Sequence, residues 1–330
     1  MRALIVGLGS IGRRHLANLR ELMPDADITV LRRPESLRTD TEIGQADRVV
    51  SSLDAALQER PEFAVIASPA AFHLDTALPL AESGVHLFVE KPLSNSLDRV
   101  DQLIDTCDRR HLVLMVGYNF RFYGPLQQLR AALNRGQIGR VVAYRAEVGM
   151  YLPDWRPSSD YRTTASARQE LGGGALLELS HELDYTRWLL GDVADVFARV
   201  QKASDLDIDV DDLAELQLSL TAGGVASIHL DMIQRVPFRN CRVIGTEGTL
   251  LWDGPSHRVA MYSAAGGEWI DLHGAAELDR NQMYLAELQH FLNCLAARQP
   301  AEPSGVDGRR VLEIIAAARE SSQSGKVIEL

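Results

Sequence analysis

Four side chains that can carry a proton lie close together in residues 178–185. Glu178, His181, Glu182 and Tyr185 follow one another at intervals of one to three positions, and on a helix this spacing places them along one face. Imidazole and carboxyl groups so arranged can accept and return the proton of a hydroxyl group, because the imidazole titrates near neutrality. An ordinary amphipathic helix with a solvent-exposed charged face would show the same spacing.

A glycine-rich stretch, VGLGSIG, follows an apolar run at the start of the chain. Gly7 would permit a tight turn, Gly9 would let the backbone approach a pyrophosphate, and Gly12 would let a helix pack on the preceding strand. The backbone amides that open this helix, at Ser10 and Ile11, would then face the phosphates. The spacing predicts a dinucleotide site, and another nucleotide-type ligand such as S-adenosylmethionine is the alternative.

Two arginines follow the second predicted strand, in the stretch TVLRRPES. At this strand end an acidic residue usually binds the 2′-hydroxyl of NAD, whereas an arginine accommodates the 2′-phosphate of NADP. Arg32 and Arg33 stand there, and no carboxylate occurs before Glu35. The residues therefore favour NADP and leave NAD open, since both guanidinium groups could also be solvated charges at a strand end.

The composition narrows the classes of protein that fit. The chain has 330 residues, of which 46% are hydrophobic and 24% are charged, values typical of a globular protein with two domains. The net charge of −11 argues against nucleic acid as a partner, since phosphate binding needs a basic face. The apolar runs are too short to cross a membrane, and three scattered cysteines without metal spacing suit a reducing cytoplasm.

One acidic run, DLDIDVDD, begins like a calcium-binding loop. Such a loop has glycine at its sixth position and glutamate at its twelfth, whereas this run has Val210 and Leu216 there. The alternation of Leu206, Ile208 and Val210 favours an acidic strand edge or loop instead. The sequence therefore predicts no metal site.

Short apolar runs alternate with helical segments through residues 1–120. The runs are almost continuously apolar, as expected for a parallel sheet covered by helices on both faces. The predicted strands are Ala3–Gly7, Ile28–Leu31, Arg48–Val50, Phe63–Ala67, His86–Glu90 and Leu112–Gly117. The predicted helices are Ile11–Leu22, Ala70–Glu82 and Ser96–Arg109. This pattern predicts an α/β fold whose N-terminal domain, 1–120, is a Rossmann domain with a doubly wound parallel sheet.

Residues 121–330 follow a different pattern. Longer strands with two-residue alternation are joined by glycine-containing turns such as TAGGV and GTEGT, as in an antiparallel sheet. Predicted helices lie at Gly174–Leu190, Asp279–Arg298 and Gly308–Ser322. We predict a C-terminal α+β domain over this range, with a largely antiparallel open sheet. Because helices on one face leave the other uncovered, that face is a candidate homodimer or homotetramer interface.

Several segments, in order, resemble the glucose–fructose oxidoreductase/inositol dehydrogenase (Gfo/Idh/MocA) family. After the glycine-rich start come VIASPAAFH, HLFVEKPLS, VGYNFRF, GGGALLELSHELD and, near the end, EPSGVDGRRVLEIIAAARESSQSGK. The resemblance covers nearly the whole chain. It implies an NAD(P)-dependent oxidoreductase that transfers hydride to or from a hydroxyl carbon of a sugar or sugar derivative. A non-catalytic dinucleotide-binding regulator and an NAD-dependent glycoside hydrolase are the alternatives.

The resemblance also implies roles for individual residues. Lys91, in the Glu-Lys-Pro triplet, would face the nicotinamide and the reacting hydroxyl, where a cation can stabilise an alkoxide and take part in proton transfer. Pro92, whose peptide bond is often cis in the family, would fix the backbone direction after it. His73 is either a cofactor neighbour or a residue that packs at a helix start. Cofactor contacts are implied at Ser68, Pro69, His73, Glu90, Lys91, Asn119 and Arg121.

The segment after the three glycines departs from the commonest family pattern. Counted from the first glycine, the family has Asp at the seventh position and the catalytic His at the eleventh. Here Glu178 is seventh, His181 tenth and Glu182 eleventh. Either His181 is the general base, which the titration range of imidazole favours, or Glu182 has replaced it; Asp184 could orient the imidazole. The variant SHELDY also resembles members found among sugar-acid and surface-polysaccharide enzymes.

An aromatic and arginine-rich stretch, YLPDWRPSSDYRTTASARQELGGG, precedes that segment. It has little periodicity and is predicted to be a loop that leads into the site. Trp155 could stack on a sugar face, and Arg162 could bind a carboxylate or phosphate. With Tyr161 and Tyr185 these are the candidate substrate-binding residues; a well-anchored surface loop with ordinary charges is the alternative.

Overall fold

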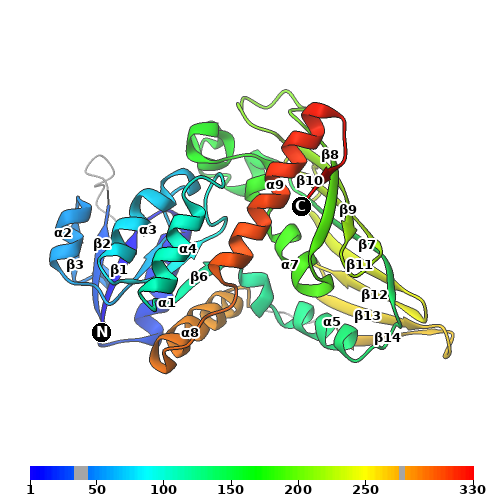
Figure 1. The fold of residues 1–330 in the computed structure, drawn as a ribbon, viewed down its shortest axis with the longest axis horizontal. Coiled ribbons are helices and arrows are strands. Elements are labelled where there is room, and N and C mark those ends of the chain that lie inside the picture. Colours follow the sequence, from blue (N-terminus) through cyan, green and yellow to red (C-terminus); the bar gives the residue numbers. More distant parts are fainter. Residues whose placement is uncertain (33–43, 275–278) are drawn as a thin grey trace. The chain divides into compact units, whose positions relative to one another are not determined.

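The computed structural model describes residues 1–32, 44–274 and 279–330 (Figure 1). The chain divides into two compact units, and each is described by itself. Unit 1 comprises Met1–Asn119 and Asn281–Leu312, and unit 2 comprises Phe120–Arg280 and Glu313–Leu330. Residues 281–312, which the sequence analysis placed in the second domain, are thus part of unit 1. The reason is that helix α8 (Asn281–Ala297) packs along helix α1 (Ser10–Leu22).

Unit 1 contains a six-stranded sheet in the order β3-β2-β1-β4-β5-β6. The strands are β1 (Arg2–Val6), β2 (Asp27–Leu31), β3 (Arg48–Val50), β4 (Phe63–Ile66), β5 (His86–Glu90) and β6 (Leu114–Gly117). All neighbours are parallel, so the predicted doubly wound sheet is confirmed. The chain order reverses between β1 and β4, and ligands of such sheets bind at the carboxyl ends of the strands near this point.

Helices cover the parallel sheet of unit 1, some of them as connections between its strands. After α1 come α2 (Leu53–Gln58), the short turn η3 (Ala70–Phe72), α3 (His73–Glu82), α4 (Val100–Arg109), α8 and the first part of α9 (Gly305–Ser324). The chain moves from the centre of the sheet toward opposite edges after β1 and after β4, and right-handed crossovers then place α1 on one face and α3 and α4 on the other. Both faces of the strands are covered, which accounts for the completely buried β4.

Unit 2 contains a nine-stranded sheet in the order β14-β13-β12-β11-β7-β10-β9-β8-β15. Its strands are β7 (Val141–Gly149), β8 (Val193–Gln201), β9 (Leu213–Leu220), β10 (Val225–Asp231), β11 (Phe238–Gly245), β12 (Gly248–Asp253), β13 (Arg258–Ser263), β14 (Glu268–His273) and β15 (Ile328–Glu329). The predicted, largely antiparallel open sheet is confirmed. It is not a simple meander, because β7 lies between β11 and β10 and pairs with β10 in parallel.

One face of the unit 2 sheet carries helices. Helices α5 (Gly124–Asn134), α6 (Ala175–Glu178) and α7 (His181–Leu190) pack against the strands. The strands alternate accordingly: in β9, Leu216 and Leu218 are buried and Gln217 is exposed. The opposite face carries the polar side chains of this alternation.

Within residues 1–32, 44–274 and 279–330, no helix combines the length and the apolar composition needed to cross a bilayer.

Candidate functional site

The glycine-rich turn joins β1 to α1 at the carboxyl edge of the unit 1 sheet. Gly7 has φ +87°, a value that side chains disfavour, and a Cβ on Gly12 would lie 2.0 Å from the carbonyl oxygen of Gly7. A Cβ on Gly9 would meet open space, and no side chain caps the N-terminus of α1. The turn thus offers an open, uncapped helix start at Ser10 and Ile11, as pyrophosphate binding requires. These residues fit a dinucleotide.

Arg32 directly follows β2, the strand beside β1. Its backbone N–H donates to Val50 O, and Gly7 N–H donates to Leu31 O at 3.0 Å. The arginine therefore starts from the same sheet edge as the glycine turn, where the ribose of a dinucleotide is bound in this fold. Arg33, the second predicted arginine, lies outside the described residues.

Ser68 and Pro69 follow β4 at this edge and are partly exposed. His73 is 1% exposed, with Nε2 2.7 Å from Ser68 O and Nδ1 3.0 Å from Pro92 O. Only a charged imidazole could donate to both carbonyls, but burial lowers the pKa of His73, so the neutral ring donates to one. His73 therefore bridges the turns after β4 and β5 from inside the unit through Ser68 O and Pro92 O. This position fits the alternative in which His73 packs at a helix start.

Glu90 and Lys91 end strand β5. Glu90 is 7% exposed, its Oε1 lies 2.5 Å from His15 Nε2, and its Oε2 accepts the backbone N–H of Lys91 at 3.1 Å. Lys91 is partly exposed, and the Lys91–Pro92 peptide bond is cis, as the family resemblance implies. The carboxyl end of β5 thus presents the Lys91 side chain, while Glu90 points into the unit.

The predicted helix Gly174–Leu190 is wrong as a single element. It is divided into α6 and α7, because Leu179 has φ −100° and ψ 22°, outside the helical range. The predicted shared face is also wrong: Glu178 and His181 are partly exposed, but Glu182 and Tyr185 are fully buried. Within α7, His181 stays partly exposed, whereas Glu182 and Tyr185 lie in the interior of unit 2.

Glu182 is held by an arginine that the sequence analysis did not identify. Arg239, on β11, places Nε 2.7 Å from Glu182 Oε1, and the Tyr185 hydroxyl donates to the same oxygen at 3.3 Å. Burial raises the pKa of Glu182, and the arginine opposes this shift. The Arg239 guanidinium also lies 4.6 Å from the Phe120 ring, which is 5.0 Å from the His181 ring. Arg239 and Phe120 thus contact the first two residues of α7, Glu182 through the ion pair and His181 through the ring.

A second ion pair, buried on both sides, holds α7 two residues after Glu182. Arg121 donates to Asp184 through Nε at 3.0 Å and through Nη2 at 2.6 Å, and the two side chains are 7% and 1% exposed. Asp184 is therefore bound to Arg121 through both oxygens. Asn119, the preceding candidate, is 2% exposed. The structure gives Arg121 a role in the interior of unit 2, not on a solvent-facing surface.

The loop before α6 is anchored at several points. Trp155 donates to Met150 O at 2.9 Å, and the Tyr161 hydroxyl accepts the N–H of Asp207 at 3.2 Å. Arg162 is exposed and pairs with Asp160 at 2.8 Å. The acidic run that resembles a calcium loop therefore packs on this loop. Trp155 and Tyr161 keep partly exposed rings, so they remain candidate substrate residues.

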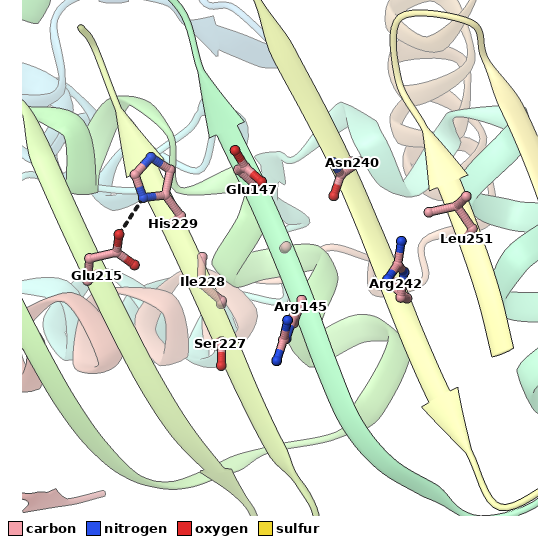
Figure 2. A pocket seen from close by; sticks show the side chains of 10 residues that line it. Arg145, Glu147, Glu215, Ser227, Ile228, His229, Asn240, Arg242 and Leu251 are labelled. Atoms are coloured by element: carbon pink, nitrogen blue, oxygen red, sulfur yellow. Dashed lines mark hydrogen bonds and ion pairs between the residues drawn. The ribbon is translucent and has the colours of Figure 1, made fainter. Parts of the chain in front are cut away.

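The outer face of the unit 2 sheet is hollowed around two rows of polar side chains (Figure 2). The acidic row is Glu215, His229, Glu147 and Asn240. The basic row is Ser227, Arg145 and Arg242. Hydrogen bonds to Asp231 and Glu215 raise the pKa of His229 to about 9, so it is charged at neutral pH. Arg145 and Arg242 are directly opposite each other on neighbouring strands.

These features define a class of protein. A Rossmann unit with an open glycine turn, joined to a unit with an open mixed sheet, has the two-domain architecture of a nucleotide-binding protein. The family model described as "Oxidoreductase family, NAD-binding Rossmann fold" matches residues 1–118, and that of the "GFO/IDH/MocA C-terminal domain" matches residues 126–251. The chain belongs to the Gfo/Idh/MocA family, which confirms the resemblance.

Relatives with known activities match almost the full length of the chain. The chain is 26% identical to a myo-inositol 2-dehydrogenase of Thermotoga maritima, covering 100% of this chain and 98% of that protein. It is 28% identical to a UDP-N-acetylglucosamine 3-dehydrogenase of Acidithiobacillus ferrooxidans, covering 94% of each. The WlbA dehydrogenase from Bordetella pertussis, solved with NADH and UDP-GlcNAcA, has a TM-score of 0.84 and 24% identity, covering 100% of this chain and 98% of that one.

Proposed function

We propose that the chain is an NAD(P)-dependent oxidoreductase that transfers hydride between nicotinamide and a hydroxyl-bearing carbon of a sugar or sugar derivative. The main support comes from two features at the carboxyl edge of the unit 1 sheet. There the uncapped start of α1 stands behind the glycine turn, and Lys91 follows β5 on the same edge. Family membership and the named activities of the relatives support the proposal.

The bound nicotinamide would accept or supply the hydride. Lys91 would hydrogen-bond the hydroxyl oxygen of the substrate and stabilise the negative charge that grows on it as the hydride leaves. His181 would take the hydroxyl proton, and Glu178 would assist it. We assign this role to His181 over Glu182 because Glu182 is fully buried and bound to Arg239. The relatives' polyhydroxylated substrates support a ring with several hydroxyl groups as substrate.

Turnover with added sugars tests the function. Purified protein is offered NAD⁺ and NADP⁺ with a panel of cyclitols, neutral sugars, sugar acids and nucleotide sugars, and the absorbance of reduced nicotinamide is followed. Reduction with at least one sugar class is expected. Nucleotide binding without any turnover would favour the non-catalytic regulator. Cleavage of a glycoside without added nucleotide and without net reduction would favour the NAD-dependent hydrolase.

For the cofactor we propose a preference for NADP, with NAD as a weaker ligand. A guanidinium that pairs with the 2′-phosphate contributes about 1.5–3 kcal/mol, which is roughly a tenfold to hundredfold change in affinity. Arg32→Asp is therefore expected to weaken NADPH binding by that factor and to leave NADH binding within about threefold. Fluorescence titration of each reduced nucleotide measures both constants.

The matched control is Arg110→Asp, the same change of charge at an exposed position after α4. It is expected to alter neither constant. Equal affinities of the wild type for NADH and NADPH, or equal losses in both arginine variants, would show that Arg32 is a solvated charge. That outcome would leave the oxidoreductase assignment intact and remove the NADP preference.

We also propose that the open face of the unit 2 sheet binds a second copy of this chain. Like charges directly opposite each other on neighbouring strands are destabilising, so Arg145 and Arg242 call for an acidic partner. A two-fold axis in the plane of the interface, parallel to the two rows and between them, lays the acidic row of one copy on the basic row of the other. The second copy thus places Glu147 opposite Arg145 and the Asn240 amide opposite Arg242.

The oligomeric state follows from this surface and can be measured by light scattering on a sizing column. The wild type is expected at twice or four times the chain mass of 36.4 kDa. Arg145→Glu with Arg242→Glu is expected to shift it to smaller species, and Arg156→Glu, in an exposed loop, to leave the mass unchanged. A monomeric wild type would contradict the proposal.

Buried, free cysteines support our proposal of a cytoplasmic location.

A further inference from the structure

Three titratable side chains meet inside unit 1. His15 comes from α1, Glu90 from the end of β5 and Glu287 from α8. They are 0%, 7% and 0% exposed, and one ring nitrogen and one oxygen of each carboxyl group lie within 4.8 Å of one another. We call these three residues the proton cluster. The contacts described above involve Glu90 but give His15 and Glu287 no function.

The first two members of the proton cluster form a short hydrogen bond. His15 Nε2 and Glu90 Oε1 are 2.5 Å apart, a hydrogen bond in which the imidazole donates when the carboxyl group is ionised. The other oxygen of Glu90 accepts the backbone N–H of Lys91 at 3.1 Å. Glu90 therefore connects His15 to the residue that carries the proposed catalytic cation. The orientation of the Glu90 carboxylate fixes the peptide from which the lysine side chain departs.

Glu287 differs from the other two residues. Neither of its carboxyl oxygens has a hydrogen-bond partner among the described residues, although its side chain is completely buried. A buried carboxylate without a partner is too costly to remain ionised, and a second negative charge nearby adds to that cost. Burial and the charge of Glu90 both raise the pKa of Glu287 well above its usual value. Glu287 is therefore a neutral acid at neutral pH.

A metal ion is the other possible occupant of such a group of residues. Two ligands of one tetrahedral zinc ion, each bound at about 2.0–2.1 Å, are roughly 3.3 Å apart. His15 Nε2 and Glu90 Oε1 are closer than that, at 2.5 Å, a distance at which a shared hydrogen is present instead. The geometry thus favours protons over a cation in the cluster.

We propose that His15 and Glu287 are positioning residues, which act through Glu90 to hold the backbone of Lys91, with Glu287 kept as a neutral carboxylic acid. His15 fixes one oxygen of Glu90 so that the other can accept from the Lys91 peptide. Glu287 contributes no charge, so the single negative charge of the two carboxyl groups stays on Glu90. This inference rests on the proposed function in assigning Lys91 to the reaction, but the protonation of Glu287 does not.

The protonation of Glu287 can be tested without any substrate. Because the folded-state pKa is raised, the folded protein keeps a proton that the unfolded chain releases above about pH 4.5, so the wild type loses stability as pH rises. Glu287→Gln does not titrate and has the same shape. Its melting temperature is expected to match the wild type near the unfolded pKa and to exceed it increasingly as pH rises, by roughly 3 °C or more per pH unit.

The titratable groups facing Glu287 are Glu90 on β5 and His15 on α1, with His73 on α3 within electrostatic reach of Glu90. All three are present in both proteins, so their own titration cancels in the difference. Glu82→Gln, at the exposed end of α3, is the matched control and should show no such divergence. A pH-independent difference, or a variant less stable than the wild type at pH 8, would overturn the assignment of a neutral Glu287.

The positioning role is tested by His15→Phe, which keeps an aromatic ring against Phe88 and removes the donor. We expect kcat to fall roughly tenfold to hundredfold, as for a misplaced catalytic group, with KM and the dissociation constant of the nucleotide within about threefold of the wild type. Glu90→Gln can still accept from the Lys91 peptide and should lose less than Glu90→Leu. An unchanged kcat in His15→Phe, or equal losses in both Glu90 variants, would overturn the role.

Two further outcomes separate this inference from the proposed function. If the wild type turns over no sugar, the proposed function fails, whereas the melting curves still report the state of Glu287. If the wild type is active and His15→Phe is equally active, the positioning role alone fails. Stoichiometric zinc or another divalent metal in the purified protein, lost in Glu287→Gln, would replace the proton cluster by a metal site.

Discussion

Lys91→Met is expected to lower kcat by about a thousandfold, within the range for removing a group that stabilises an oxyanion and transfers a proton. Methionine has nearly the length of lysine and no charge, so the turn after β5 can keep its shape. The nucleotide should still bind, because the glycine turn that holds the pyrophosphate is unaltered. Turnover with the sugar found in the substrate screen measures kcat, and fluorescence titration measures nucleotide binding.

The control for this variant is Lys202→Met, the same substitution at an exposed position after β8. It should leave both measurements unchanged. Full turnover in Lys91→Met would remove the lysine from the reaction and with it the main chemical argument for an oxidoreductase. Loss of nucleotide binding together with kcat would instead mean that the turn after β5 had changed shape.

The ion pair of Arg121 and Asp184 is expected to show strong coupling in stability. Both side chains are almost completely buried, so removing one partner leaves an uncompensated charge in the interior, at a cost of about 3–5 kcal/mol. Arg121→Met and Asp184→Leu should each lower the free energy of unfolding by that amount. The double variant should be more stable than either, because it leaves no buried charge. Urea unfolding measures all four proteins.

An exposed pair of the same unit provides the comparison. Arg258 and Asp271 are 2.7 Å apart, with side chains 42% and 51% exposed, and water screens such pairs. Arg258→Met is expected to cost about 0–1 kcal/mol. If Arg121→Met and Arg258→Met lowered the free energy of unfolding equally, the interior position of Arg121 would be incorrect.

Local signals in the sequence were sufficient for the sheets and for the glycine turn. The parallel strands of unit 1 are short apolar runs, and the strands of unit 2 alternate every two residues, so each pattern reports directly on burial. Gly7 and Gly12 are needed because a side chain there would strain the backbone or collide with it. Such requirements are local and can be read from spacing alone.

The candidate site was predicted less well where tertiary contacts decide the outcome. Leu179 leaves the helical range and divides the predicted helix, and α7 then packs with Glu182 and Tyr185 in the interior. Helical periodicity shows neither the break nor which side of the helix is covered. Arg239 had no signal in the sequence, because its contact with Glu182 joins positions 57 residues apart. The direction of each side chain follows from the packing of α7 on the sheet.

The proton cluster could have been found only in part. His15 lies on the same face of α1 as Gly12 and Leu19, three residues before and four residues after it, and is the titratable member of that buried face. A buried histidine there could have been predicted from the helix alone. Glu287 could not, since its burial depends on α8 packing along a helix some 270 positions away in the sequence.

The division of unit 1 into two segments has a consequence for the order of events during synthesis. Residues 281–312 complete unit 1, and the whole of 120–280 is translated before them. Proteins of several domains generally fold their N-terminal domain first as the chain emerges. Unit 1 must therefore wait for residues 281–312, and unit 2 for residues 313–330. A chain that ends between residues 120 and 280 has all six strands of the Rossmann sheet but leaves one flank of α1 uncovered.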